Sequence, residues 1–200
     1  MTTDTKYTFF RYIYKQISWR EIADFLYSFK ELEMELDASI YYELIGFDFT
    51  QKDKHSRFTD LLFTKVIDRG EYFSWAIASS LDQLIASPQQ LDKKMFDLRR
   101  LYEETIEKEH SLGCDFLDYF GGGYFYSFYR GYEVPWEKNY LEEIAQKYEP
   151  VRVIAQKISD GLKGGDIHIF KDGTYSIDSE LEKELETLNR AVYPRLGWNN

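Results

Sequence analysis

The chain has 200 residues with a formal net charge of −10, and 18% of them are aromatic. This length buries enough surface for folding without a disulfide or a metal, and the single cysteine, Cys114, fits a reducing compartment. The acidic balance argues against a nucleic-acid or anionic-membrane binder, because both need a basic face. No stretch approaches the roughly 20 apolar residues that span a bilayer, and the N-terminus lacks the pattern of a secretory signal. We therefore predict a cytoplasmic protein.

The first thirty residues predict two helices. Residues Lys6–Gln16 are rich in types that favour strands, yet from Phe9 onwards the apolar residues also fall at helical spacing, and we favour a helix. Ser18 and Glu21 have the spacing of a capping box, in which each side chain satisfies the other residue's free backbone N–H. The buried stripe expected for this second helix consists of Trp19, Ile22, Leu26 and Phe29.

Three further helices are expected before residue 86. The first is Asp37–Ile45, capped by its first residue and ended by Gly46. The second is about Arg57–Asp68. Gly70 is expected to separate it from the third, Tyr72–Ala86, because glycine interrupts a helical pattern.

The central part of the chain predicts longer helices. Ser87-Pro88 has the form of a helix start, with a capping residue followed by proline, and opens the longest helix, to about His110. Val134-Pro135 opens another in the same way. Pro150 is expected to restart or kink the chain, because the residue before a proline avoids helical geometry. This helical region ends at Gly164-Gly165, which is also the best place for a minor domain boundary.

The C-terminal part predicts the one β element and a last helix. Residues Asp166–Ile177 form a β-hairpin around Asp172-Gly173, the dipeptide preferred in two-residue type I′ turns. Such a turn pairs Phe170 with Tyr175 and His168 with Ile177. Ser179 and Glu182 have the spacing of a second capping box. The fold class expected for residues 1–200 is therefore a single, mostly helical domain with one small hairpin.

The most distinctive stretch is Asp115–Trp136, in which ten of 22 residues are aromatic. The run Gly121–Gly123 divides the aromatic residues, and it lacks the following Lys-Ser/Thr of a phosphate-binding loop. The stretch is either an aromatic corner of the core or, at its rim, an anchor for a protein partner. The candidate anchors are Tyr124, Tyr126, Tyr129, Tyr132 and Trp136.

Catalytic and metal-binding patterns are weak. Cys114 follows His110 by four residues, but Gly113 interrupts the helix between them and no third group orients the pair. The histidines are scattered without metal-ligand spacing, so we predict no metal and no cofactor. We favour a protein without catalytic activity. The alternatives are a small enzyme with a carboxylate and tyrosine site around Asp115–Tyr132, or a helical scaffold subunit.

Acidic residues are concentrated in two segments. Six acids and no base lie between Glu31 and Asp48, and a second cluster covers Asp178–Glu186. Such surfaces either keep a protein soluble or steer it towards a basic partner. We therefore predict a protein that binds and inhibits a basic protein, either an immunity or antitoxin-type inhibitor of a nuclease-like toxin or a decoy that mimics nucleic acid. The acids expected to steer the partner are Glu31, Glu33, Glu35 and Asp37.

Overall fold

The computed structural model of the chain describes residues 1–86, 97–101, 138–172 and 174–192. These residues are mostly helical, with one two-stranded antiparallel hairpin near the C-terminus, which confirms the predicted fold class. The chain divides into two compact units, Met1–Tyr72 and Phe73–Asn200. The boundary suggested at Gly164-Gly165 lies inside the second unit, and the single domain stays a prediction.

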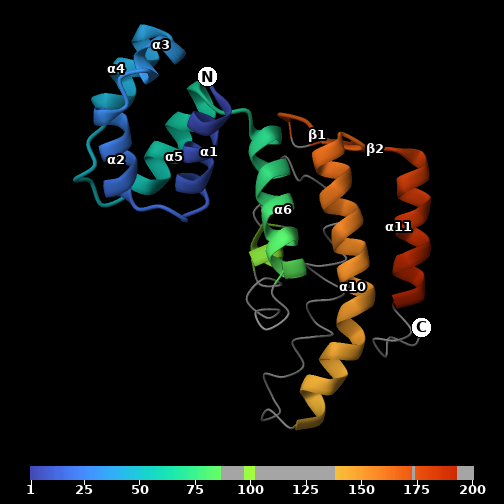
Figure 1. Ribbon diagram of the computed structural model, residues 1–200. Coiled ribbons are helices and arrows are strands. Elements are labelled where there is room, and N and C mark those ends of the chain that lie inside the picture. The colour runs from blue at the N-terminus through green and yellow to red at the C-terminus, as the bar shows by residue number, and fades with distance from the viewer. Residues whose placement is uncertain (87–96, 102–137, 173, 193–200) are drawn as a thin grey trace. The chain divides into compact units, whose positions relative to one another are not determined.

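The first unit is built from short helices (Figure 1). They are α1 (Thr3–Ile13), α2 (Trp19–Ser28), α3 (Leu32–Glu35), α4 (Ala38–Ile45), α5 (Lys54–Lys65) and the start of α6 (Arg69–Ala86). α1 contacts α2 and α5, and α4 contacts α2 and α3. The helix expected within Lys6–Gln16 is confirmed. The predicted bounds of α4, after Asp37 and before Gly46, are also right, but the Asp37 side chain makes no capping bond. The short helix α3 was not predicted.

The boundary between α5 and α6 differs from the prediction. α5 starts earlier than expected and ends at Lys65. Asp68, expected as the last residue of that helix, instead accepts the Glu71 N–H with its carboxylate (3.1 Å) at the start of α6. Gly70, expected to separate the two helices, therefore lies in the first turn of α6. An aspartate that satisfies a free N–H stabilises the start of a helix, which is why the break comes before Asp68.

Phe58 of α5 lies at the centre of the first unit's core. Its side chain is fully buried, and its ring contacts the rings of Tyr12, Phe47 and Phe49 at centroid distances of 5.5, 4.8 and 5.1 Å. The rings meet at steep angles, an arrangement that aromatic pairs prefer over face-to-face stacking. Other fully buried side chains of this unit are Phe9, Ile22, Leu26, Leu32, Leu44 and Leu62.

α1 ends in a Schellman motif whose left-handed residue is a lysine. The Lys15 N–H donates to the Tyr12 carbonyl (3.0 Å), and the Gln16 N–H donates to the Arg11 carbonyl (2.8 Å). These two bonds define the motif. Lys15 has a φ of 62°, where glycine is favoured because a Cβ crowds the backbone. Backbone strain is therefore stored at Lys15.

Replacing Lys15 by glycine is expected to raise the free energy of unfolding by about 0.5–1 kcal/mol. The substitution removes a left-handed strain of about 1–2 kcal/mol, and the greater freedom of glycine in the unfolded chain offsets part of that gain. Urea titration of the full chain measures the change. Lys15→Ala is the control, because it removes the same charge but keeps the Cβ; equal stabilisation by both variants would contradict the strain.

α2 begins with the predicted capping box. The Glu21 N–H donates to Ser18 Oγ (3.3 Å), and the Ser18 N–H donates to the Glu21 carboxylate (2.7 Å). The bond from the Ser18 backbone is the main reason why the pKa of Glu21 is lowered. The predicted buried stripe is right for Ile22 and Leu26, which are buried, and wrong for Trp19, which is 39% exposed.

The second unit contains the longest described helix. Its elements are the rest of α6, α10 (Lys138–Gly164), β1 (Ile167–Ile169), β2 (Tyr175–Ile177) and α11 (Ser179–Val192). α10 continues as one helix through Pro150, so the chain does not restart there; burial of the next residue, Val151, helps to offset the hydrogen bond that proline removes. Residues 97–101 are helical and belong to the helix predicted from Ser87-Pro88. The rest of that helix and the start predicted at Val134-Pro135 lie outside the described residues.

α10 lies between α6 and α11 (Figure 1). Asp82 of α6 accepts hydrogen bonds from two side chains of α10, Ser159 Oγ at 2.6 Å and Lys163 Nζ at 2.7 Å. On the opposite side, a Cβ placed on Gly161 would come within 2.8 Å of the Leu181 side chain. This glycine therefore permits α10 and α11 to approach closely.

The hairpin forms at the predicted place but one residue out of the predicted register. The pairs are Ile167 with Ile177, His168 with Ser176 and Ile169 with Tyr175. The predicted pairing of His168 with Ile177 and of Phe170 with Tyr175 is therefore wrong. Because side chains alternate along a strand, the register that is formed buries Ile167 and Ile169 and leaves His168 exposed.

Two aspartates explain the local differences around the hairpin. The Asp172 carboxylate accepts the Thr174 N–H (3.0 Å) and the Thr174 hydroxyl (2.7 Å), and this side-chain turn lengthens the connection by one residue. The Asp178 carboxylate accepts the Glu180 N–H (2.9 Å). Asp178, and not the predicted Ser179, therefore caps α11.

Candidate functional site

Three of the four acids predicted to steer a partner are exposed, and the fourth is bonded within the protein. Glu31, Glu33 and Asp37 are exposed, and the Asp37 side chain makes no capping bond to α4. The fourth, Glu35, accepts the Thr2 N–H (2.8 Å) and the Thr2 hydroxyl (3.2 Å) with its carboxylate. The bond from the Thr2 backbone is the largest cause of the lowered pKa of Glu35. Glu35 therefore holds α3 to the start of α1.

Large apolar side chains are also exposed on the helices around these acids. Met34 of α3 is 80% exposed, Tyr42 of α4 is 60% exposed, and Tyr27 of α2 is 64% exposed. The Tyr27 hydroxyl donates to the Ile45 carbonyl (3.1 Å), which holds that ring against the end of α4. The exposure of Met34 was not predicted from the sequence, because the single helical turn of α3 was not predicted; this turn buries only Leu32. We call Glu31, Glu33, Met34, Asp37, Tyr27 and Tyr42 the acidic–aromatic surface.

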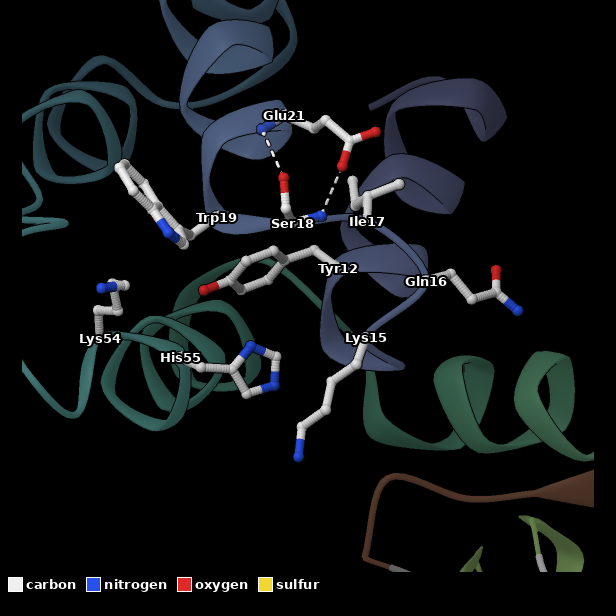
Figure 2. A pocket seen from close by; sticks show the side chains of 9 residues that line it. All are labelled: Tyr12, Lys15, Gln16, Ile17, Ser18, Trp19, Glu21, Lys54 and His55. Atoms are coloured by element: carbon white, nitrogen blue, oxygen red, sulfur yellow. Dashed lines mark hydrogen bonds between the residues drawn. The ribbon is translucent and has the colours of Figure 1, made fainter.

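A pocket of about 610 Å³ lies where the end of α1, the start of α2 and the start of α5 meet. The side chains that matter most for its chemistry are Tyr12, Lys15, Ile17, Trp19, Lys54 and His55. Figure 2 shows the hydroxyl end of Tyr12 between the side chains of Trp19, Lys54 and His55. The Tyr12 and His55 rings are in contact, with centroids 4.8 Å apart. Residues far apart in the sequence thus form one aromatic and cationic pocket.

The Tyr12 hydroxyl has no hydrogen-bond partner among the described residues, although the side chain is only 1% exposed. Burial raises the pKa of this phenol to about 12. A buried hydroxyl without a partner loses its bonds to water and gains none in return, which costs about 1–3 kcal/mol. Such a group in a native structure calls for an explanation.

Replacing Tyr12 by phenylalanine is expected to raise the free energy of unfolding by about 1 kcal/mol at neutral pH, because it removes the unsatisfied hydroxyl. The folded pKa of about 12 exceeds the ordinary value of 10.0, so the wild-type chain loses further stability as pH rises from 10 towards 12. The advantage of Tyr12→Phe is therefore expected to grow in that range. Urea titrations at several pH values measure it.

The matched control for this substitution is Tyr27→Phe, which removes a hydroxyl that is already bonded to the Ile45 carbonyl. This control is not expected to gain stability. A loss of stability in Tyr12→Phe would contradict the assignment, because it would show that the hydroxyl has a stabilising partner in the folded chain.

Two cationic side chains lie near the exposed ring of Trp19. Lys54 Nζ lies 4.9 Å and Arg20 Cζ 5.3 Å from its ring centroid, within the range of cation–π attraction. These contacts explain why Trp19 lies at the pocket and not in the core. The pKa of His55 is lowered, mainly by burial and then by the charge of Lys15, so its imidazole is neutral at pH 7.

The remaining predicted anchors lie outside the described part of the chain: Tyr124, Tyr126, Tyr129, Tyr132 and Trp136. The weak catalytic pattern of His110 and Cys114, and the stretch Asp115–Tyr132 of the alternative enzyme, lie outside it as well. Among the described residues, no three His, Cys, Asp or Glu side chains gather as metal ligands would. Within the same ranges, no helix has the length and apolar character needed to cross a membrane.

Comparison of the chain with protein-family models, curated proteins and solved structures finds no match.

Proposed function

We propose that this chain is an acidic interaction protein that binds and inhibits a basic protein. The observation that carries the proposal is the composition of the acidic–aromatic surface. Exposed Glu31, Glu33 and Asp37 occur there together with exposed Met34 and Tyr42 within Glu31–Asp48, a stretch that contains no Lys or Arg. Methionine and tyrosine are enriched in protein interfaces, whereas an acidic surface with only a solubilising role needs no exposed apolar side chains.

The two kinds of side chain have different roles in this proposal. The acids attract a basic partner over a distance and raise the association rate, mainly at low ionic strength. Tyr27, Tyr42 and Met34 supply contact area that slows dissociation once the partner is bound. The partner is either a nuclease-like toxin that an immunity or antitoxin-type protein blocks, or an enzyme of nucleic-acid metabolism that is inhibited by a mimic of its substrate.

Affinity capture with the tagged full chain tests the proposal. A protein with a basic isoelectric point is expected to be recovered, and its enzymatic activity is expected to fall when the purified chain is added. If added nucleic acid relieves the inhibition by competition, the result favours a protein that mimics nucleic acid. If the chain inhibits an isolated nuclease, the result favours an inhibitor of a toxin. The proposal fails if the recovered proteins are not basic, or if a basic partner keeps full activity when it is bound.

A further inference from the structure

We propose that the pocket between α1, α2 and α5 binds a small aromatic molecule that carries one anionic group, a carboxylate or a phosphate. This site is separate from the acidic–aromatic surface and does not depend on it. Its lining includes the cations Lys15 and Lys54, the ring of Trp19 and the buried Tyr12. Three observations point to a ligand of this chemistry.

The first observation is the unpartnered hydroxyl of Tyr12. It is directed into the pocket between Trp19, Lys54 and His55 (Figure 2), and it lacks a partner among the described residues. A phenol donates readily to an anionic oxygen, and a charge-assisted hydrogen bond is stronger than a neutral one. An anion in the pocket would therefore satisfy the donor that the protein itself leaves unpaired.

The second observation is the position of the cations. Lys54 Nζ lies over the Trp19 ring at 4.9 Å, and no ion pair involves either Lys54 or Lys15 among the described residues. Glu21, the acid of the pocket, accepts the Ser18 N–H at the start of α2. The pocket thus carries two lysine charges against one carboxylate that is already hydrogen-bonded, and it favours an anion.

The third observation is the strained Lys15 at the pocket's edge. Its left-handed backbone is of the kind that glycine adopts without strain, yet the chain has a lysine there. Strained residues occur preferentially at binding and catalytic sites, where the side chain is needed in spite of the strain. A cation held at this position is consistent with a negatively charged ligand.

The aromatic walls define the rest of the ligand. The rings of Trp19 and His55 and the side chain of Ile17 offer flat and apolar contact area. An aromatic ring fills such a pocket, and its anionic substituent would draw the Lys54 ammonium from the Trp19 ring and accept the Tyr12 hydroxyl. An anion without a ring would leave the aromatic walls without contacts, and an uncharged ring would leave the lysines and the Tyr12 hydroxyl without an anionic partner.

Isothermal titration calorimetry on the full chain tests the proposal with four probes. Benzoate and phenyl phosphate carry the two anionic groups on a ring, benzamide carries the ring without the charge, and inorganic phosphate carries the charge without the ring. At least one of the two aromatic anions is expected to bind with a Kd below about 1 mM. Benzamide and inorganic phosphate are expected to bind at least tenfold more weakly, about 1.4 kcal/mol.

Two substitutions locate the binding in the pocket. Lys54→Gln is expected to weaken the aromatic anion about tenfold, and Tyr12→Phe about three- to tenfold. Lys52→Gln is the matched control, because Lys52 is an exposed lysine outside the pocket lining, and it is expected to leave the affinity unchanged. Circular dichroism checks that each variant is folded.

Several results would overturn the proposal. These are the absence of binding by both aromatic anions, equal binding of benzamide or inorganic phosphate, and an affinity that neither Lys54→Gln nor Tyr12→Phe reduces. An equal loss of affinity in Lys52→Gln would also overturn the proposal, because binding of the anion would then depend only on the net charge of the protein.

Discussion

Replacing Phe58 by alanine is expected to lower the free energy of unfolding by about 3–5 kcal/mol. Phe58 is fully buried at the centre of the first unit, where its ring contacts Tyr12, Phe47 and Phe49. The substitution removes the apolar area of a phenyl ring and leaves a cavity among three aromatic neighbours that are themselves held by packing. Natural proteins are stable by only about 5–15 kcal/mol, so this loss is a large part of the total.

Urea titration of the full chain, followed by far-ultraviolet circular dichroism, measures this loss. The control is Tyr42→Ala, which truncates another aromatic side chain of the first unit that is 60% exposed. Exposed substitutions usually change stability by no more than about 0.5 kcal/mol. A similar, small change in both variants would contradict the position of Phe58 in the core.

Neutralising Glu31, Glu33 and Asp37 together is expected to reduce the association rate with the captured basic partner at least tenfold at low ionic strength. The dissociation rate is expected to change much less, because exposed charges at the edge of an interface act mainly on the encounter. The difference from the wild-type chain is expected to shrink as salt is added, since screening shortens the range of the attraction. Glu35 is kept, because its carboxylate holds Thr2 and its loss would disturb the fold.

Surface plasmon resonance at several salt concentrations measures both rates. The matched control neutralises Glu180, Glu182 and Glu186 of α11, three exposed acids of the second acidic segment, and so changes the net charge equally. Glu184 is kept because it joins α11 to Lys157 of α10 (2.8 Å), whereas Glu186 pairs only with the exposed Arg190 of its own helix (3.4 Å). An equal effect of both triple variants would show that only the net charge of the protein matters. An unchanged association rate in the variant of Glu31, Glu33 and Asp37 would contradict the steering role of the acidic–aromatic surface.

The predictions that succeeded rest on local bonds. Ser18 and Glu21 are three residues apart, and their reciprocal bonds depend only on the turn of chain between them. The end of α4 at Gly46 and the place of the hairpin also follow from signals in the local sequence, although the Asp37 side chain makes no capping bond to α4. At the hairpin, two different turns can form from the same few residues, and the sequence alone did not show which of them forms. The Asp172 side chain bonds Thr174 and shifts the register by one residue.

Contacts between distant residues account for the differences at Glu35 and Trp19. Glu35 stands among free acids in the sequence, but its carboxylate is bound to Thr2, which is 33 residues away. Trp19 falls on the apolar stripe of its helix, but Lys54 of α5 lies over its ring at the surface. Periodicity shows which residues share one side of a helix and does not show which distant side chains meet them.

The sequence by itself determined the helical class of the protein, the place of its hairpin and its acidic segments, because hydrogen bonds within helices and turns join residues a few positions apart. Only the tertiary structure decided which acids are free and which apolar side chains of α2, α3 and α4 are exposed beside them. It also formed the pocket, in which Tyr12, Trp19 and Lys54 come together from three helices. Such a site depends on packing between elements, and that packing is set by the whole core of the unit.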